Sequence, residues 1–156
     1  DHIGANLRMT EVQAAVGRIQ LKNLNRMVNT RRKLAKIIID FIEKNKLFFT
    51  FKLNKKYFGS FYRLYFFLDK KRLSKKLNRE KVIKSLRKDG NDVSVGSCPE
   101  IYLEKSFRKI LKKKIILPNA QYLSKISLAY SFSHLTSKKE IYQFLNSIKK
   151  ISKGLQ

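Results

Sequence analysis

The chain has 156 residues, of which 43% are hydrophobic, a mean hydropathy of −0.38 and a formal charge of +25 at pH 7. This length is sufficient for a domain with its own core, and no apolar run reaches the ~18 residues of a membrane-spanning helix. The start shows no signal-peptide pattern, and the single cysteine, Cys98, excludes an internal disulfide. These features fit a globular protein of the reducing cytoplasm.

The excess of 36 Lys and Arg over 11 Asp and Glu would by itself favour nucleic acid or an anionic membrane as partner. The lysines are, however, spread over nearly every segment and are mixed with Ile, Asn, Phe and Tyr, as in chains encoded by AT-rich genomes. We therefore interpret the charge as a solvated surface and expect neither specific nucleic-acid recognition nor membrane binding. A non-catalytic basic module that binds nucleic acid or a protein partner is the alternative.

A first helix is predicted to begin at Thr10. Thr10 and Gln13 have the spacing of a capping box, in which each side chain bonds the other residue's backbone N–H. The apolar stripe that follows at helical spacing consists of Val12, Ala15, Val16 and Ile19. Gly17 lies with Ala14 and Ala15 on a surface of small side chains, which indicates either tight core packing or a subunit interface.

A second helix is predicted over residues 24–45, after a bend at Lys22 and Asn23. Two strands should follow, a short one over 47–52 and a central, aromatic one over 61–68. Arg63 is the one charge in the aromatic strand, where it either faces solvent or binds a carboxylate. The stripe of the second helix, which we assign to the core, consists of Leu34, Ile37, Ile38, Phe41 and Ile42.

The next predicted helix follows a basic loop over residues 70–76. Asn78 has the side chain of an N-cap, and Gly90 supplies a left-handed stop. A strand is predicted directly after it, over 92–96. Strand, helix and strand in this order favour an α+β unit.

The last third contains a helix over residues 120–125, with Pro118 suited to its first turn. Strict alternation over 126–132 predicts a strand that is buried on one face. Ser137 and Glu140 then form a second capping box. The final helix has an inward stripe and a frayed tail from residue 152; the stripe consists of Ile141, Phe144, Leu145, Ile148 and Ile151.

Few residues are candidates for chemistry. Cys98 follows the strand over 92–96, but neither His2 nor His134 stands at a spacing that would activate it as a nucleophile. The sequence shows no metal-ligand spacing, no carboxylate pair for acid–base work and no Gly-rich phosphate loop. We therefore expect no catalytic residue and no metal site in this chain. Asn6, upstream of a helix N-terminus, either forms a turn or helps to bind an anion such as phosphate.

Several stretches together resemble one protein family. At the start, the matching positions are Gly4, Asn6, Arg8 to Glu11, Gln13 to Ala15, Gly17, Gln20 and Leu21. Later matches, in the same order, are Arg31-Arg32 with Ala35, Gly96 to Phe107, Leu117-Pro118 with Ala120, and Ser127-Leu128. The chain resembles the C-terminal part of the DegT/DnrJ/EryC1/StrS family of pyridoxal-phosphate (PLP)-dependent nucleotide-sugar aminotransferases. It departs from the family at His134, where a His-Pro turn is usual.

The resemblance implies a fold and a division into domains. We expect an α+β structure, the C-terminal part of a fold-type I PLP-dependent transferase. Residues 1–46 would form the end of the large cofactor-binding domain and the connecting helices. Residues 47–156 would form a small C-terminal domain with a mainly antiparallel sheet covered by helices.

The resemblance also implies an activity. The whole enzyme would be a cytoplasmic homodimer that transfers an amino group from glutamate or glutamine to a keto nucleotide sugar, in the biosynthesis of surface polysaccharide such as lipopolysaccharide O-antigen. Asn6 would contact the phosphate of PLP in the partner subunit, and Ser97 and Tyr102 would face the substrate. The lysine that holds PLP would lie upstream of Asp1, so we expect the isolated chain to be inactive.

Overall fold

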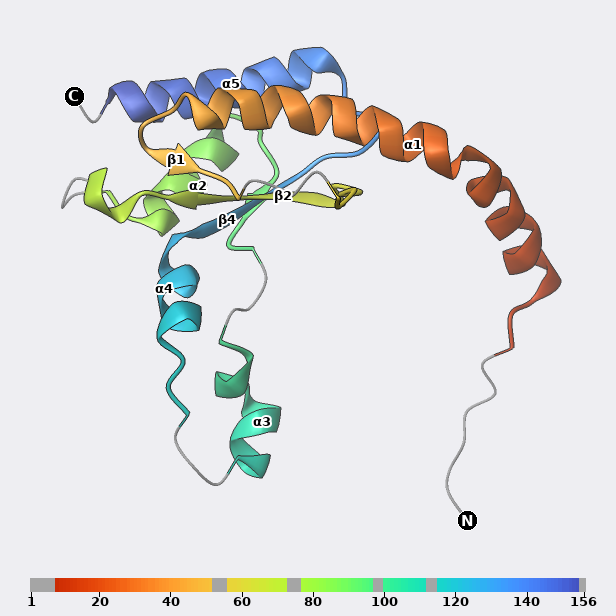
Figure 1. Ribbon diagram of the computed structural model, residues 1–156, viewed down its shortest axis with the longest axis horizontal. Coiled ribbons are helices and arrows are strands. Elements are labelled where there is room, and N and C mark those ends of the chain that lie inside the picture. The colour runs from red at the N-terminus through yellow and green to blue at the C-terminus, as the bar shows by residue number, and fades with distance from the viewer. Residues whose placement is uncertain (1–7, 52–55, 73–76, 97–99, 112–114, 155–156) are drawn as a thin grey trace.

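A four-stranded antiparallel sheet with helices packed on one face forms the centre of the molecule (Figure 1). This computed structural model describes residues 8–51, 56–72, 77–96, 100–111 and 115–154. The sheet has the order β1-β2-β4-β3 and consists of β1 (Phe48–Phe49), β2 (Arg63–Leu68), β3 (Val93–Ser94) and β4 (Ser127–Ser131). The helices are α1 (Glu11–Glu43), α2 (Arg79–Lys88), α3 (Lys105–Ile110), α4 (Pro118–Ile126) and α5 (Lys138–Lys153). The architecture confirms the predicted α+β class and the central position of the aromatic strand.

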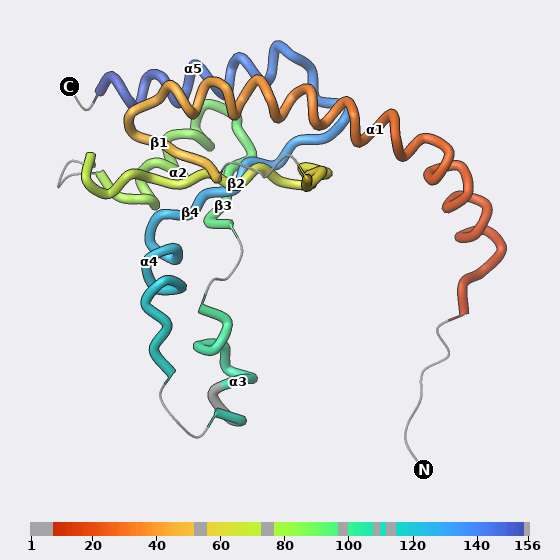
Figure 2. The backbone as a smooth tube through the Cα atoms, viewed as in Figure 1, coloured from red at the N-terminus to blue at the C-terminus, as the bar shows by residue number. Residues whose placement is uncertain are grey.

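The core lies between the sheet and a layer made of α5, α2 and the C-terminal part of α1 (Figures 1 and 2). Leu64 and Phe66 of β2 face this layer, since they pair in register with Tyr130 and Leu128 of β4, which are buried in the same cluster. In α5, spacings of three and four residues place one apolar stripe against the sheet. The buried residues of that stripe are Ile141, Phe144, Leu145 and Ile148. Each such side chain contributes about 1.5–3 kcal/mol when fully buried.

Helix α1 runs without interruption from Glu11 to Glu43, so the predicted division into two helices at Lys22 and Asn23 is wrong, while the helix curves along its N-terminal half (Figure 1). Neither Gly nor Pro interrupts the backbone there, and the Asn23 amide donates a hydrogen bond of 3.2 Å to the Ile19 carbonyl one turn earlier. The polar side chain is thus satisfied within the helix. The capping box is confirmed: Thr10 N–H donates to Gln13 Oε1 at 2.9 Å, and Gln13 N–H donates to Thr10 Oγ1 at 3.3 Å.

The two ends of α1 lie in different environments. All its buried residues fall between Leu34 and Ile42 and share one core with residues after 47. The N-terminal end extends away from the sheet (Figure 1), and Val12 and Ile19 are 74% and 60% exposed. A Cβ added at Gly17 would meet nothing within 4 Å. Among the described residues, the surface formed by Ala14, Ala15 and Gly17 is therefore not packed in a core. A subunit interface at this surface stays a prediction. The predicted domain boundary at residue 46 also stays a prediction.

Strand β4 is buried on both faces, whereas its alternation predicted burial on one. The Ser127 hydroxyl donates to the Val95 carbonyl at 3.1 Å, which satisfies a polar side chain that is only 6% exposed. Ala129, on the same face, is small enough to be covered completely. Two small residues, Ser127 and Ala129, therefore occupy alternate positions of the strand without facing solvent.

Other local predictions had mixed outcomes. Asn78 caps α2 by accepting from Lys81 N–H at 2.9 Å, and Gly90 has the predicted left-handed backbone, with φ +82°. The predicted loop over 70–76 contains a 3-10 turn at Lys70–Arg72, and α3 was not predicted. The tail predicted to fray from residue 152 is helical through Lys153, and the Asn45 amide donates to Ser152 Oγ at 3.1 Å.

The two capping boxes provide a matched test of where the stability resides. Ser137→Ala should lower the free energy of unfolding by about 1 kcal/mol, because it removes a cap from the helix that carries the core stripe. Thr10→Ala removes the same kind of cap from the end of α1 that lies outside the core, and we expect a much smaller loss. Urea denaturation of both variants measures the difference; equal losses would contradict this division of α1.

Candidate functional site

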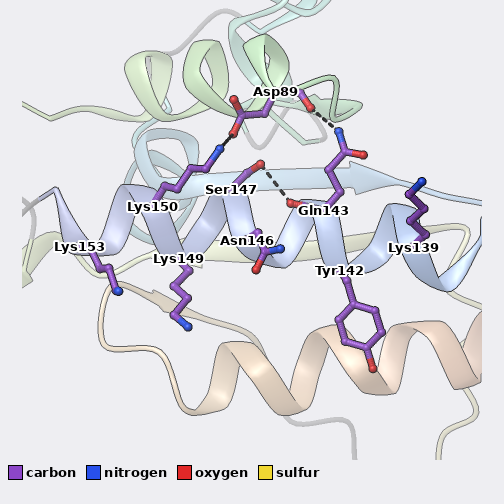
Figure 3. A pocket seen from close by; sticks show the side chains of 9 residues that line it. All are labelled: Asp89, Lys139, Tyr142, Gln143, Asn146, Ser147, Lys149, Lys150 and Lys153. Atoms are coloured by element: carbon purple, nitrogen blue, oxygen red, sulfur yellow. Dashed lines mark hydrogen bonds and ion pairs between the residues drawn. The ribbon is translucent and has the colours of Figure 1, made fainter.

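An open cavity of about 790 Å³ runs along the exposed side of α5 (Figure 3). Lysines dominate it, and the carboxylate of Asp89 is bound there by Lys150 at 3.5 Å, while the Asp89 carbonyl accepts from Gln143 Nε2 at 2.8 Å. A hydrogen bond from Ser147 and the charge of Lys150 lower the pKa of the Asp89 carboxyl. The cavity offers positive charge but no activated nucleophile and no carboxylate pair. We interpret it as a solvated face of α5 rather than a catalytic site.

The sheet face opposite α5 leads to the segment that carries the predicted substrate residues. Gly96 has φ +83°, and a Cβ there would lie 3.4 Å from the Tyr65 ring and 3.5 Å from Ser127 Oγ. A side chain is therefore disfavoured at residue 96 both by the backbone and by the close neighbours. This requirement fixes where the chain leaves the sheet. Ser97 and Cys98, which follow, lie outside the described residues.

Tyr102 is the one predicted substrate residue that the structure describes. It lies in a 3-10 turn (Ile101–Leu103), is 9% exposed, and its hydroxyl donates to Glu100 Oε1 at 2.8 Å. Burial and the neighbouring carboxylate raise the pKa of the Tyr102 phenol, and a backbone hydrogen bond from Leu117 opposes that rise. The phenol thus ties Tyr102 to Glu100 within the turn before α3.

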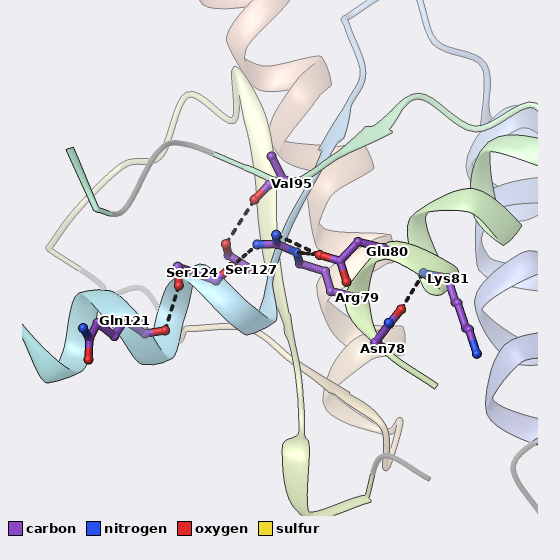
Figure 4. Close-up of polar contacts among 8 residues, drawn as sticks. All are labelled: Asn78, Arg79, Glu80, Lys81, Val95, Gln121, Ser124 and Ser127. Atoms are coloured by element: carbon purple, nitrogen blue, oxygen red, sulfur yellow. Dashed lines mark hydrogen bonds and ion pairs between the residues drawn. The ribbon is translucent and has the colours of Figure 1, made fainter. Parts of the chain in front are cut away.

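A second contact fixes α4 to the body of the molecule. Helices α3 and α4 extend away from the sheet on the side opposite α1 and α5 (Figure 1). The Arg79 guanidinium, at the start of α2, donates to the Ser124 carbonyl of α4 and forms an ion pair with Glu80 at 3.1 Å (Figure 4). The Arg79 side chain is 17% exposed, so these bonds are partly shielded from water. The C-terminal end of α4 is therefore anchored where β4 begins.

The described residues contain no metal-ligating cluster and no enclosed lysine. They contain no group of three metal-ligating His, Cys, Asp or Glu side chains, and His134 lies in a turn, as predicted. A lysine that forms a Schiff base with PLP must meet the cofactor in an enclosed site. Every lysine whose side chain is described is exposed. These residues therefore do not fit that role, and Asn6, the predicted phosphate contact, lies outside the described ranges.

No helix in the described part of the chain is both long enough and apolar enough to cross a membrane.

Known proteins match this chain in sequence and in fold. A sequence model of the DegT/DnrJ/EryC1/StrS aminotransferase family matches residues 1–149. An uncharacterised protein of Methanocaldococcus jannaschii, MJ1066, is 28% identical over 95% of this chain and 38% of its own length. The crystal structure of an aminotransferase from Psychrobacter cryohalolentis has a TM-score of 0.88 and 29% identity, covering 99% of this chain and 42% of that one.

A more distant structure shows the same fold. Helicobacter pylori PseC, an aminotransferase of pseudoaminic acid biosynthesis, has a TM-score of 0.82 at 21% identity and covers 99% of this chain and 40% of its own. The chain thus spans about two fifths of the length of the proteins that it matches. Taken with the described fold, the match over residues 1–149 shows that the chain belongs to the DegT/DnrJ/EryC1/StrS aminotransferase family, a family of PLP-dependent enzymes.

Proposed function

We propose that this chain is the C-terminal part of a PLP-dependent aminotransferase that transfers an amino group from glutamate or glutamine to a keto nucleotide sugar. The observation that carries the proposal is the match of 99% of the chain, at a TM-score of 0.88, to an aminotransferase with 29% identity. The whole enzyme would be a cytoplasmic homodimer that serves surface-polysaccharide biosynthesis, including that of lipopolysaccharide O-antigen. PLP would supply the electron sink for the amino transfer, from a site outside the described residues.

Two structural neighbours support a sugar substrate. PseC takes part in pseudoaminic acid biosynthesis, and a second neighbour is a GDP-4-keto-6-deoxymannose-3-dehydratase trapped with a PLP-glutamate geminal diamine, with a TM-score of 0.79. The dehydratase also shows that this fold supports a different reaction, so fold alone does not select amino transfer. These neighbours favour a keto nucleotide sugar as the amino acceptor and glutamate as the amino donor.

The exposed end of α1 supports the proposal that residues 1–46 belong to the larger domain of the complete enzyme. Val12, Val16 and Ile19 form one stripe with 53–74% exposure. An apolar stripe of this kind normally packs against another surface. In the proposed enzyme that surface would come from the upstream part of the chain or from the second subunit.

Tyr102 and Ser97 are proposed to face the sugar substrate. Support comes from the position of Tyr102, whose hydroxyl lies beside the Glu100 carboxylate on the segment that follows the sheet edge at Gly96. The bond to Glu100 holds the Tyr102 hydroxyl in place, so the small exposed part of this side chain would meet a ligand in a fixed position.

The proposed absence of activity in the isolated chain can be tested directly. With PLP, glutamate and a keto nucleotide sugar, the chain of residues 1–156 should form no amino sugar, whereas a protein extended upstream to include the predicted lysine should form it. Exposed lysines will react weakly with PLP, so each is replaced in turn and Schiff-base absorbance is followed. Absorbance that one substitution abolishes would place a cofactor lysine within this chain and contradict the proposal.

Asn6→Ala in the extended protein should speed the loss of PLP, because it removes an amide that we place on the cofactor phosphate. The loss of one hydrogen bond to a charged group corresponds to an increase of about tenfold or more in the off-rate. Asn25→Ala, on the exposed surface of α1, is the matched control and should leave the rate unchanged. The cofactor off-rate is measured by dialysis and absorbance, and equal rates in all three proteins would refute the role of Asn6.

Tyr102→Phe in the extended protein should raise KM for the nucleotide sugar by roughly three- to tenfold, the value of one hydrogen bond, with a smaller change in kcat. Glu100→Gln keeps the phenol and a hydrogen-bonding partner, so it should have a weaker effect. Steady-state kinetics, together with a melting curve for each variant, separates a substrate contact from a loss of local structure. An unchanged KM in folded Tyr102→Phe would exclude the proposed contact, and Ser97→Ala is tested in the same way.

A further inference from the structure

We propose that the cavity beside the N-terminal half of β2 binds a small carboxylate with an apolar body, and that Arg63 binds its carboxylate group. The proposal depends on the geometry of this cavity and not on the proposed aminotransferase activity. The sequence left two alternatives for Arg63, the solvent or a carboxylate. The surroundings of its guanidinium favour the second.

The cavity has a volume of about 380 Å³, which suits a molecule of the size of a substituted benzoate. It lies between β2, the residues that follow β1, and Ile39 of α1. Arg63 is the only charged residue among those that line it. The apolar part of its wall is formed by Ile39, Phe51, Phe61 and Leu64. A ligand that fills the cavity must therefore be mainly apolar.

Among the residues that the structure describes, the charge of Arg63 has no acidic partner. Within the described ranges its guanidinium makes no hydrogen bond and no ion pair, whereas Arg72 and Arg79 pair with Asp69 and Glu80 at 3.4 and 3.1 Å. The residue is half-buried, so its charge is partly removed from water without compensation from a carboxylate.

Its one aromatic contact leaves the donors of the guanidinium available. Arg63 Cζ lies 5.4 Å from the centre of the Tyr62 ring. A guanidinium held over an aromatic face keeps its N–H groups in its own plane, where they can bind both oxygens of a carboxylate. The contact with Tyr62 thus orients the guanidinium of Arg63, and its N–H groups have no acceptor among the described residues.

The segment that enters β2 is held in an unusual conformation. Phe61 has φ +49°, the only positive φ among the described non-glycine residues, and such a backbone costs roughly 1–2 kcal/mol. Arg32 stabilises this segment: its Nε donates to the Gly59 carbonyl at 3.0 Å, and its guanidinium lies 5.0 Å from the Phe58 ring centre. Phe61 in turn packs against the core. One wall of the cavity is therefore formed in advance of any ligand, which lowers the entropic cost of binding.

A monocarboxylate fits this site better than a phosphate. A phosphate carries nearly two charges and three acceptor oxygens, and sites for it usually provide several donors or a helix N-terminus. Here a single arginine lines the cavity together with apolar residues, and the hydroxyl of Thr50 is already bonded to the Tyr65 carbonyl at 3.0 Å. A monocarboxylate with an apolar body would pair with the charge of Arg63 and pack against the apolar wall of the cavity.

The test compares benzoate with benzyl alcohol, which has nearly the same apolar body and no charge. Both are titrated into the chain of residues 1–156, and amide chemical shifts are followed by two-dimensional NMR. Benzoate should saturate with shifts concentrated around Ile39, Phe61 and Leu64, and it should bind at least about tenfold more tightly than benzyl alcohol, the usual value of a charge-assisted pair.

Arg63→Gln should weaken benzoate about tenfold and leave benzyl alcohol unchanged, while Arg63→Lys, which keeps the charge but not the planar fork, should have an intermediate affinity. Arg72→Gln is the control for net charge and should have no effect; the spectra also report whether each variant is folded. Equal binding of both probes, no saturation by benzoate, shifts centred on the lysines of α5, or full affinity in Arg63→Gln would overturn the proposal. Because no cofactor or enzyme assay is involved, this result is separate from any failure of the proposed aminotransferase activity.

Discussion

The contact of Phe144 with the sheet is the interaction on which the rest of this structure depends. Its ring lies parallel to that of Tyr130, with centroids 3.8 Å apart, and edge-on to Phe66 at 5.9 Å. One residue of α5 thus contacts both central strands of the sheet. The site is dry enough that burial, with smaller contributions from Glu140 and Asp92, raises the pKa of Tyr130 to about 12. Because α5 is fixed here, it can serve as the surface along which α1 and α2 pack.

With α1, α2 and α5 packed on one face of the sheet, the segments that carry the predicted site residues lie on the other side or at the edges. Gly96 allows the chain to leave the sheet closely packed against Tyr65, and the Arg79 contact with Ser124 fixes α4 near the start of β4. The cavity beside Arg63 lies at the edge where β1 ends after two residues. A short strand leaves room beside its longer neighbour, and Arg63 is one of the residues that line this room.

The sequence correctly predicted features, such as helix caps, that depend only on neighbouring residues. Thr10, Asn78 and Ser137 were placed correctly as caps, since a cap depends on a few neighbouring residues. The burial of Ser127 was missed, because its partner, the Val95 carbonyl, is brought to it only by the folding of the sheet. The same holds for Arg63: its charge is visible in the sequence, but the absence of an acidic partner among the described residues is a property of the fold. Asn6 and Ser97 lie outside the described ranges, so their roles remain predictions.

The stability of α1 shows how far this chain depends on surfaces beyond its own core. Its buried residues begin only at Leu34, although the helix begins at Glu11. An isolated helix of this composition gains little from intrinsic propensity, and most helical stability in proteins comes from packing of an apolar face. The stripe of Val12, Val16 and Ile19 provides such a face without a described partner. The matched aminotransferase is more than twice as long as this chain, and in the longer protein that we propose, the additional residues would supply the packing that holds the first half of α1 in place.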